Sequence, residues 1–254
     1  MRRVRRFVCF TVDLVVTLTL WFYFLFGYSL LYLPVIMILY PFVPQRDVLI
    51  QKMNHFFYRG FFLLFRLIAP RVKIQIDDSV RNIQSSIIVS NHRSYLDPLL
   101  YISLFPLHKT IVKGIFFKVP VMGWIMRKSG FMPHSNGVAA DERMTDGVNS
   151  LPQFFSGGGN LFIFPEGRRS RNGRIGHFHK GAFSLSARYE VPVELFYIRN
   201  TDKVFPPGRF VFTTCERVTV ELERLGRIES KGLKAREIRD RAFAMYAAHE
   251  AESR

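Results

Sequence analysis

His92 and Asp97 lie five residues apart, directly after a short apolar run that predicts a buried strand. A turn into a helix that starts near Tyr95 would bring the Asp97 carboxylate back to the His92 imidazole. The carboxylate would then accept one ring N–H and leave the other ring nitrogen free as a base. A base held in this way suits removal of a proton from an alcohol that attacks an activated acyl group, so no protein nucleophile is required.

The spacing of His92 and Asp97 is not specific by itself. The chain has 7 histidines, and an aspartate at a given offset from one of them is a common event. No other histidine has an aspartate at plus five. A structural alternative, in which Asp97 caps a helix and His92 bonds a loop, stays open on this segment alone.

A second polar cluster follows another predicted strand at 161–164, which comes after the helix-breaking sequence GGGN at 157–160. The cluster reads PEGRRSR over 165–171. Arginines beside a glycine suit phosphate binding, because glycine lets the backbone approach closely and guanidinium matches phosphate geometry. Glu166 could bond an acceptor hydroxyl or orient an arginine. The alternative on this segment alone is a solvated basic loop.

Four segments between about 85 and 195 resemble, in order and approximate spacing, the sequence blocks of the glycerolipid acyltransferase family, which includes 1-acylglycerol-3-phosphate acyltransferases. The first, NHRSYLD at 91–97, is similar to the family's His-x4-Asp block. The third, FPEGRRS at 164–170, is similar to Phe-Pro-Glu-Gly-Thr-Arg-Ser. VPV at 191–193 resembles the fourth block. The residues that resemble the second block are Lys113, Pro120, Gly123, Trp124 and Gly130.

This resemblance implies an O-acyltransferase in which His92 is the general base and Asp97 orients it. It also implies an acyl-CoA or acyl-carrier-protein thioester as cosubstrate, no bound cofactor and no metal. Lys113, Glu166 and Arg169 would bind the acceptor headgroup. The full set of expected substrate-binding residues is Lys113, Glu166, Gly167, Arg168, Arg169 and Ser170.

The expected function is transfer of a fatty acyl chain to a lysolipid hydroxyl, with 1-acylglycerol-3-phosphate giving phosphatidic acid in phospholipid biosynthesis as the leading case. Two departures keep other acceptors open. Arg168 stands where the family usually has threonine, and FMPH at 131–134 replaces an Ile-Asp-Arg-like stretch. The alternatives are a lyso-amino-acid lipid, another lysophospholipid or glycerol 3-phosphate. A catalytically silent membrane-binding protein is the non-enzyme alternative.

The N-terminal segment is predicted to be embedded in a membrane. Residues 7–42 carry one charged side chain, Asp13, and four arginines precede them. This run is long for one span and short for two, since a span needs about 20 residues. Bends at 27–29 and Pro34 predict a hairpin of helices 7–26 and 30–42. A single spanning helix and a signal peptide are the alternatives. The basic start predicts an active site on the cytoplasmic face, at the inner membrane if the source is bacterial.

The net charge of +16 predicts anionic partners. An apolar segment accompanies this charge, whereas a nucleic-acid-reading motif does not. We therefore expect membrane lipids, a lysolipid acceptor and an acyl thioester donor as partners, and no nucleic acid. Acyl carrier protein is a possible further partner. The two cysteines do not predict a disulfide, since Cys9 lies inside the apolar segment and is not expected to reach Cys215.

The alternation of elements predicts an α/β fold with a central mixed sheet flanked by helices and with the N-terminal membrane hairpin. The expected parts are the hairpin at 1–46, an interfacial amphipathic helix at 47–70 and the acyltransferase domain at 71–254. Strands are expected at 72–76, 86–90, 110–112, 161–164, 193–198, 210–214 and 218–222. Helices are expected at 48–68, 97–104, 118–128, 140–155, 180–189 and 231–250.

Overall fold

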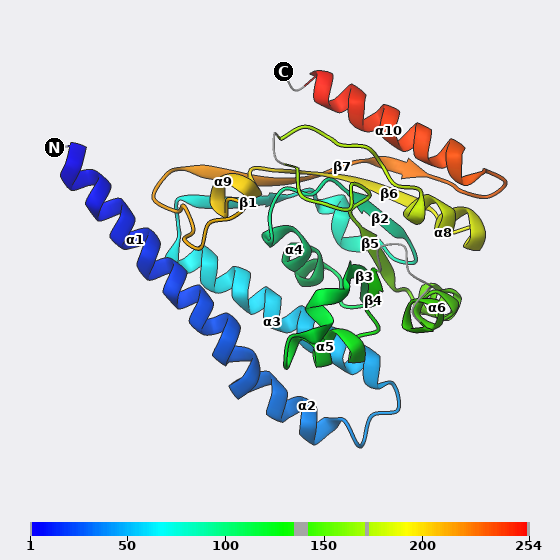
Figure 1. Ribbon diagram of the computed structural model, residues 1–254, viewed down its shortest axis with the longest axis horizontal. Helices are drawn as coiled ribbons and strands as arrows, with labels where there is room; N and C mark the ends of the chain where they lie inside the picture. The colour runs from blue at the N-terminus through cyan, green and yellow to red at the C-terminus, as the bar shows by residue number, and fades with distance from the viewer. Residues whose placement is uncertain (1, 135–141, 171–172, 253–254) are drawn as a thin grey trace.

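A mixed sheet of seven strands lies at the centre of the chain in the computed structural model, which describes residues 2–134, 142–170 and 173–252 (Figure 1). The strands are β1 (Val72–Ile76), β2 (Ile87–Ser90), β3 (His108–Lys113), β4 (Met132–His134), β5 (Asn160–Ile163), β6 (Val193–Arg199) and β7 (Val218–Ile228). Their order is β1-β7-β6-β2-β5-β3-β4. β7 is antiparallel to β6, and the other neighbouring strands are parallel, so the predicted mixed α/β sheet is confirmed.

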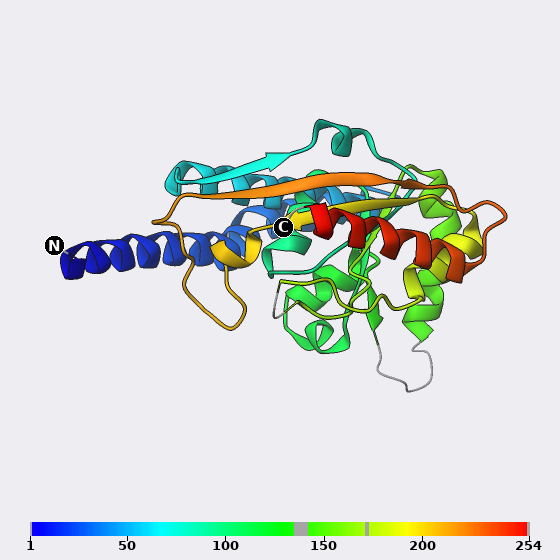
Figure 2. The ribbon, with the colours of Figure 1, turned by 90° about the horizontal axis from the view of Figure 1, so that it is seen from above.

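Helices cover both faces of this sheet (Figures 1 and 2). They are α1 (Arg2–Phe22), the π-helical segment η1 (Tyr23–Tyr32), α2 (Leu33–Leu39), α3 (Arg46–Ile68), the 3-10 turns η2 (Asp78–Asn82) and η3 (Gly114–Lys118), α4 (Leu96–Leu104), α5 (Met122–Lys128), α6 (Glu142–Asn149), α7 (Leu151–Ser156), α8 (Gly181–Tyr189), α9 (Thr201–Val204) and α10 (Ala235–Glu252). α3 and α4 pack on one face, whereas α8 and α10 pack on the other.

The two cores explain why 87–89 of β2 and 161–163 of β5 read as unbroken apolar runs. Ile88 and Phe162 point into the core on the α3 and α4 face. Their chain neighbours Ile87 and Leu161 point into the core on the α8 and α10 face. Because helices cover both faces, neither set of alternate residues meets solvent, and polar residues do not interrupt the pattern.

The parallel strands β2, β5 and β3 are neighbours, so their carboxyl ends meet at one edge of the sheet. Segment 91–97 follows β2, segment 164–170 follows β5, and Lys113 ends β3. Ligands of open α/β sheets commonly bind at the carboxyl ends of the strands. The topology therefore places the predicted residues at one edge.

The N-terminal arm differs from the predicted hairpin. Residues Arg2–Leu39 form a continuous helical run, and the chain reverses after α2, so the bends predicted at 27–29 and Pro34 are wrong (Figure 1). Pro34 is the second residue of α2, and proline is tolerated in the first turn of a helix. The returning arm is α3, which runs antiparallel beside the long helix. The stretch Arg3–Leu39, of 37 residues, is long and apolar enough by length and composition to cross a membrane.

Aromatic and polar contacts join the two arms of this N-terminal structure. Tyr23 donates a hydrogen bond to the Phe57 carbonyl at 2.9 Å, and Tyr28 donates one to Asn54 Oδ1 at 3.0 Å. The Tyr23 and Phe57 rings stack with centroids 4.9 Å apart. These contacts explain why the helix continues through the glycine at 27: α3 packs against it at this point.

The segment 210–214, predicted as an edge strand, is a loop that packs on α1. Two of its backbone N–H groups bond side chains of α1, and the Thr213 N–H bonds the Val204 carbonyl at 2.8 Å. Phe212 N donates to Thr17 Oγ1 at 2.9 Å, and Thr214 N donates to Asp13 Oδ1 at 2.7 Å. Asp13 also accepts from the Thr214 hydroxyl and from Cys215 N. The single charge in the apolar segment is thus a contact with the α/β domain.

This packing also overturns the expectation for the cysteines. Cys9 of α1 and Cys215 form a disulfide with their Cα atoms 5.4 Å apart. The spacing lies within the range that disulfides require. Cys9 reaches Cys215 because the loop containing Cys215 folds onto α1 next to Asp13.

We expect Asp13→Ala to lower the stability of the domain without touching the sheet. The variant leaves three donors of residues 214 and 215 without their acceptor. Losing bonds to a carboxylate of this kind costs about 2 kcal/mol, which corresponds to a fall of roughly 4–8 °C in the thermal unfolding midpoint. The measurement is thermal unfolding of the full chain in detergent. Thr11→Ala is the matched control, because Thr11 is exposed and bonds its own helix. Equal shifts for both variants would contradict the docking role of Asp13.

Further elements differ from the sequence-based expectations. The helix expected at 140–155 is two helices, α6 and α7, separated at Ser150, and Pro152 is the second residue of α7. Residues 140 and 141 lie outside the described residues. β4 and α9 were not expected, since three or four residues give no periodic signal. β7 extends to Ile228, beyond the predicted strand end at 222, because it pairs with β1 and with the whole of β6.

A buried histidine in β3 makes the fold sensitive to acid. His108 is fully buried, its Nδ1 lies 2.8 Å from the Phe105 carbonyl, and its Nε2 has no hydrogen-bond partner among the described residues. Burial lowers the pKa of His108 from 6.5 to about 3, and the nearby His55 acts in the same direction. Between these values the unfolded chain binds a proton that the folded chain does not.

We therefore expect the free energy of unfolding to fall as pH drops below 6.5, with His108 contributing up to about 1.4 kcal/mol per pH unit. His108→Asn keeps a donor for the Phe105 carbonyl but cannot titrate, so its stability should fall less between pH 7.5 and pH 5. Urea unfolding at the two pH values checks this. The exposed His134→Asn is the control. An unchanged pH dependence in His108→Asn would refute the assignment.

Candidate active site

His92 and Asp97 make the contact that their spacing predicts. The His92 Nδ1 atom lies 2.8 Å from Asp97 Oδ2. The same oxygen accepts from Arg93 N at 2.6 Å and from Ser94 N at 2.8 Å, which closes the turn between β2 and α4. Asp97 is fully buried in the first turn of α4, where the helix dipole favours a negative charge. With Nδ1 donating to the carboxylate, Nε2 is the nitrogen left to accept a proton.

Three residues of the segment after β5 also contact His92. The His92 ring stacks on Phe164, with the centroids 4.2 Å apart and the planes 19° from parallel. His92 N donates to Glu166 Oε1 at 3.1 Å, and Ser170 N donates to the His92 carbonyl at 2.7 Å. The two sequence segments therefore form one structural unit. The imidazole remains 17% exposed, which leaves it open to a substrate.

Glu166 is buried, and both of its carboxylate oxygens bond backbone groups. Oε1 accepts from His92 N, and Oε2 accepts from Gly176 N at 2.9 Å. Burial raises the pKa of Glu166 above its ordinary value, and these two hydrogen bonds act in the opposite direction. The contact of Glu166 with the acceptor headgroup stays a prediction. Its bonds connect the backbone at His92 to the backbone at Gly176.

The glycine and arginines that follow Glu166 lie in a tight turn. Gly167 has a φ of +66°, and its N–H bonds the Phe164 carbonyl at 3.0 Å, which explains why a residue without a Cβ stands there. Arg168 is exposed to solvent. The Arg169 guanidinium carbon lies 3.7 Å from the centroid of the Tyr95 ring. Ser170 donates its hydroxyl to the Arg174 carbonyl at 2.8 Å, so this hydroxyl stabilises the loop.

Lys113 lies at the carboxyl end of β3, on the same edge of the sheet as His92 and Arg169. Its side chain is exposed, and within the described ranges it makes no hydrogen bond or ion pair with the other predicted site residues. The contact of Lys113 with a substrate stays a prediction. Among the described residues, no group of three histidine, cysteine, aspartate or glutamate side chains could hold a metal ion.

Sequence reasoning missed a set of contacts around Arg93, the neighbour of His92. Arg93 Nη2 donates to the Gly173 carbonyl at 2.8 Å and to the Tyr197 hydroxyl at 3.1 Å. Tyr197 in turn donates to Glu250 Oε1 at 3.3 Å, which also accepts from Ile175 N at 3.1 Å. The last turn of α10 therefore supports the loop beside the site. Glu250 is 157 residues from Arg93 along the chain, counting 250 minus 93, so no local pattern could reveal the connection.

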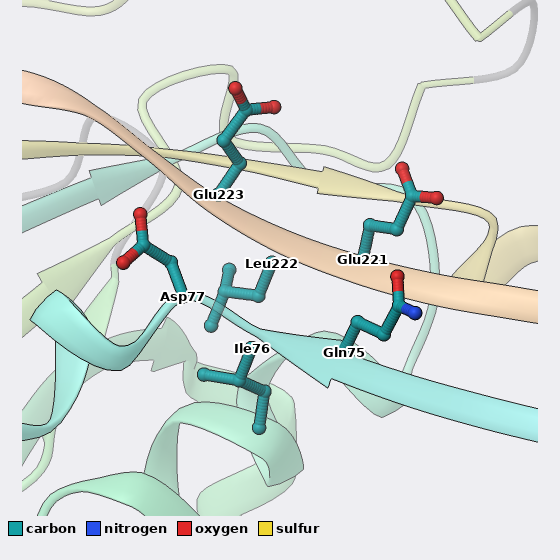
Figure 3. A pocket seen from close by; sticks show the side chains of 6 residues that line it. All are labelled: Gln75, Ile76, Asp77, Glu221, Leu222 and Glu223. Atoms are coloured by element: carbon teal, nitrogen blue, oxygen red, sulfur yellow. The ribbon is translucent and has the colours of Figure 1, made fainter.

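A shallow hollow of about 330 Å³ lies elsewhere, between β1 and β7 (Figure 3). Its lining residues are Gln75, Ile76, Asp77, Glu221, Leu222 and Glu223. The carboxylates of Glu221 and Glu223 lie 3.9 and 3.8 Å from the Arg199 guanidinium. The hollow holds acidic groups at one border of the sheet, and none of the residues predicted to act on a substrate lines it.

This is an α/β protein with an apolar N-terminal arm. His92, Asp97 and Arg169 lie at one edge of its sheet. Residues 71–197 match the family described as Acyltransferase, and the chain belongs to this family. The resemblance inferred from the four sequence blocks is therefore confirmed.

Relatives agree with this membership, and a solved structure shares the fold. The chain is 35% identical over 188 residues to a chloroplastic 1-acyl-sn-glycerol-3-phosphate acyltransferase of Arabidopsis thaliana, covering 72% of this chain and 51% of that protein. It is 36% identical over 188 residues to a chloroplastic protein of the same description from Brassica napus, covering 72% and 53%. The chain thus spans about half the length of these relatives. The crystal structure of a 1-acyl-sn-glycerophosphate acyltransferase from Thermotoga maritima matches with a TM-score of 0.72 at 20% identity, covering 99% of this chain and 98% of that one, and this likeness concerns the fold.

Proposed function

We propose that this protein transfers a fatty acyl chain from a thioester to the hydroxyl of 1-acylglycerol-3-phosphate, which yields phosphatidic acid. The observation that supports this most directly is the 2.8 Å contact between His92 Nδ1 and Asp97 Oδ2. It leaves Nε2 as a base, and the bond from Ser170 N to the His92 carbonyl sets Arg169 nearby. The names of the relatives from two plants support the same acceptor.

The reaction needs one base and no covalent enzyme intermediate. His92 Nε2 takes the proton from the acceptor O–H while the oxygen attacks the carbonyl carbon of the thioester. The buried Asp97 carboxylate stabilises the imidazolium that forms. The C–S bond then breaks, and the leaving sulfur takes the proton back from His92. The donor is acyl-CoA or an acyl-carrier-protein thioester, and no bound cofactor or metal enters these steps.

Positive charge at the same sheet edge suits a phosphate headgroup. Arg168, Arg169 and Lys113 lie on the segments that follow β5 and end β3. An arginine binds a phosphate through two parallel N–H donors, which favours a headgroup with a terminal phosphate over a neutral one. Glu166 acts here as a positioning residue, because its oxygens bond the backbone of His92 and Gly176.

The apolar arm suggests how the site meets a lipid. Large apolar side chains of α1, η1 and α2 are exposed, for example Phe7 at 72% and Leu30 at 66%. Leu63 and Leu67 of α3 are exposed as well. We propose that this surface lies in the membrane and that the active site is on the cytoplasmic face, because four arginines lie at the start of α1, before its apolar stretch. Reporter enzymes fused to the C-terminus test this: a periplasm-dependent reporter that becomes active would place the domain on the opposite face.

A headgroup panel tests the proposed acceptor. The purified full chain in detergent micelles is supplied with one acyl-CoA or one acyl-carrier-protein thioester. The acceptors are lysophosphatidate, neutral and zwitterionic lysophospholipids, a lyso-amino-acid lipid and glycerol 3-phosphate, with the products identified by mass. We expect kcat/KM for lysophosphatidate to exceed the others by at least about tenfold, as for sites that bond a group the competitor lacks. A higher value for a lyso-amino-acid lipid, or no acyl transfer to any acceptor, would overturn the proposal.

A further inference from the structure

Tyr95 is an exposed aromatic residue inside an otherwise buried turn. It is 48% exposed, whereas its neighbours Ser94 and Leu96 are 0% and 3% exposed. The turn between β2 and α4 therefore presents one large ring at the surface, directly beside the His92–Asp97 pair. An isolated exposed aromatic residue needs no explanation. This ring, however, contacts a guanidinium that belongs to the other segment of the site.

Arg169 lies over the face of this ring, with its guanidinium carbon 3.7 Å from the ring centroid. The Nη1 atom of Arg169 is buried and has no hydrogen-bond partner among the described residues. No carboxylate of the described residues forms a salt bridge with it, so the stack with Tyr95 is the contact that fixes the guanidinium plane. Stacking uses the face of a guanidinium and leaves the N–H groups at its edge available to an anion.

Both partners of this stack are held in place by other contacts. The bond from Ser170 N to the His92 carbonyl fixes the backbone next to Arg169. On the other side, the Tyr95 ring lies 6.4 Å from the ring of the buried Phe205. Phe205 stacks on Phe212, whose N–H bonds Thr17 of α1. The aromatic support of Tyr95 thus continues to the helix that is apolar enough to enter a membrane.

We propose that Tyr95 is a positioning residue for the acceptor: its ring holds the Arg169 guanidinium flat beside His92, so that the edge of the guanidinium binds the lysolipid phosphate. This inference rests on the proposed function. The acceptor phosphate binds through Arg169, and the ring sets the plane in which its donors point. Lysine at 169 would keep the charge but lose the flat stack, so the ring matters only when the residue at 169 is arginine.

Steady-state kinetics of the purified full chain test the proposal. The rates are measured with lysophosphatidate varied at saturating acyl-CoA, and then with acyl-CoA varied at saturating lysophosphatidate. Tyr95→Phe keeps the ring, so its KM values should stay within about twofold of the original protein. Tyr95→Leu should raise the KM for lysophosphatidate about tenfold, within the range that cation–π contacts span, and should leave the KM for acyl-CoA within about twofold.

Double variants make the coupling between Tyr95 and Arg169 measurable. Tyr95→Leu should have little further effect in an Arg169→Lys or Arg169→Ala background, because the stack is already absent. Tyr189→Leu is the matched control. Tyr189 lies in α8, and the guanidinium carbon of Arg188 is 5.2 Å from the centroid of its ring, so this variant also removes an arginine–tyrosine contact. That variant should leave both KM values unchanged. Thermal unfolding of each variant checks that the chain is folded.

The outcomes separate this inference from the proposed function. If Arg169→Ala leaves the KM for lysophosphatidate unchanged, Arg169 does not bind the acceptor, and both this inference and that part of the proposed function fail. If Arg169→Ala raises that KM but Tyr95→Leu does not, only the positioning role of Tyr95 fails. A loss with Tyr95→Phe as large as with Tyr95→Leu, an equal rise in both KM values, or additive effects in the double variants would also overturn it.

Discussion

Replacing His92 with alanine is expected to lower kcat for acyl transfer by about 10³-fold, within the range that a positioned general base contributes. The acceptor hydroxyl would then have to lose its proton to water. The KM values for both substrates should change little, because the backbone contacts of residue 92 with Glu166 and Ser170 do not need the imidazole. Initial rates with lysophosphatidate and acyl-CoA give both quantities.

The control for this variant is His177→Ala. His177 is an exposed histidine whose ring packs against His179, so its removal changes the histidine count without reaching Asp97. Its kcat should stay within about twofold of the original value. If His92→Ala retained full kcat while remaining folded by thermal unfolding, His92 would not be the base that removes the acceptor proton.

The predictable part of the fold is the part in which a local pattern has one physical solution. β2, β5 and β6 are short apolar runs bounded by polar turns, and a strand buried on both faces is the structure that fits such runs. Segment 210–214 has an alternating pattern as well, but the N–H groups of Phe212 and Thr214 bond the side chains of Thr17 and Asp13. An alternation of apolar and polar residues does not show whether the backbone N–H groups of a segment bond a neighbouring strand or the side chains of a helix.

The N-terminal arm shows how packing between distant segments overrides local signals. The glycine at 27 and Pro34 predict bends, yet the helix continues, because α3 packs against the glycine and Pro34 occupies a first-turn position. The disulfide between Cys9 and Cys215 has the same origin. The sequence around either cysteine does not indicate its partner. The two cysteines come together because the loop that contains Cys215 packs on α1 at Asp13.

At the candidate active site, the contact between His92 and Asp97 was easier to predict from the sequence than the contacts that support these two residues. The spacing of His92 and Asp97 determines whether a turn can join them, so their contact was predictable. The contacts of Glu166 and Tyr95 were not, because each has a partner on another segment. The oxygens of Glu166 bond backbone groups at His92 and Gly176, and its contact with the acceptor headgroup stays a prediction. The sequence alone does not show whether the carboxylate of a glutamate bonds a substrate or the backbone.

Replacing Asp97 with asparagine is expected to lower kcat by about 10²- to 10³-fold and also to reduce stability. Asp97 Oδ2 accepts three N–H bonds, from His92 Nδ1, Arg93 N and Ser94 N, so the amide oxygen of asparagine must take that place. The imidazole keeps its tautomer but loses the charge that stabilises the imidazolium. The amide NH2 then occupies the position of Oδ1, which is buried without a partner among the described residues. An unsatisfied buried donor costs roughly 1–3 kcal/mol.

Glu194→Gln separates the two effects of that substitution. Glu194 is a buried carboxylate in β6 that bonds Arg224 at 2.7 Å and Arg227 at 3.3 Å. Its neutralisation should lower the thermal unfolding midpoint by an amount similar to that of Asp97→Asn, whereas kcat of the folded enzyme should stay within about twofold. A large loss of kcat in both variants would mean that activity follows stability and not the charge next to His92. A loss confined to Asp97→Asn would assign the effect to that charge, because a buried carboxylate is removed in each case and only one of them contacts the base.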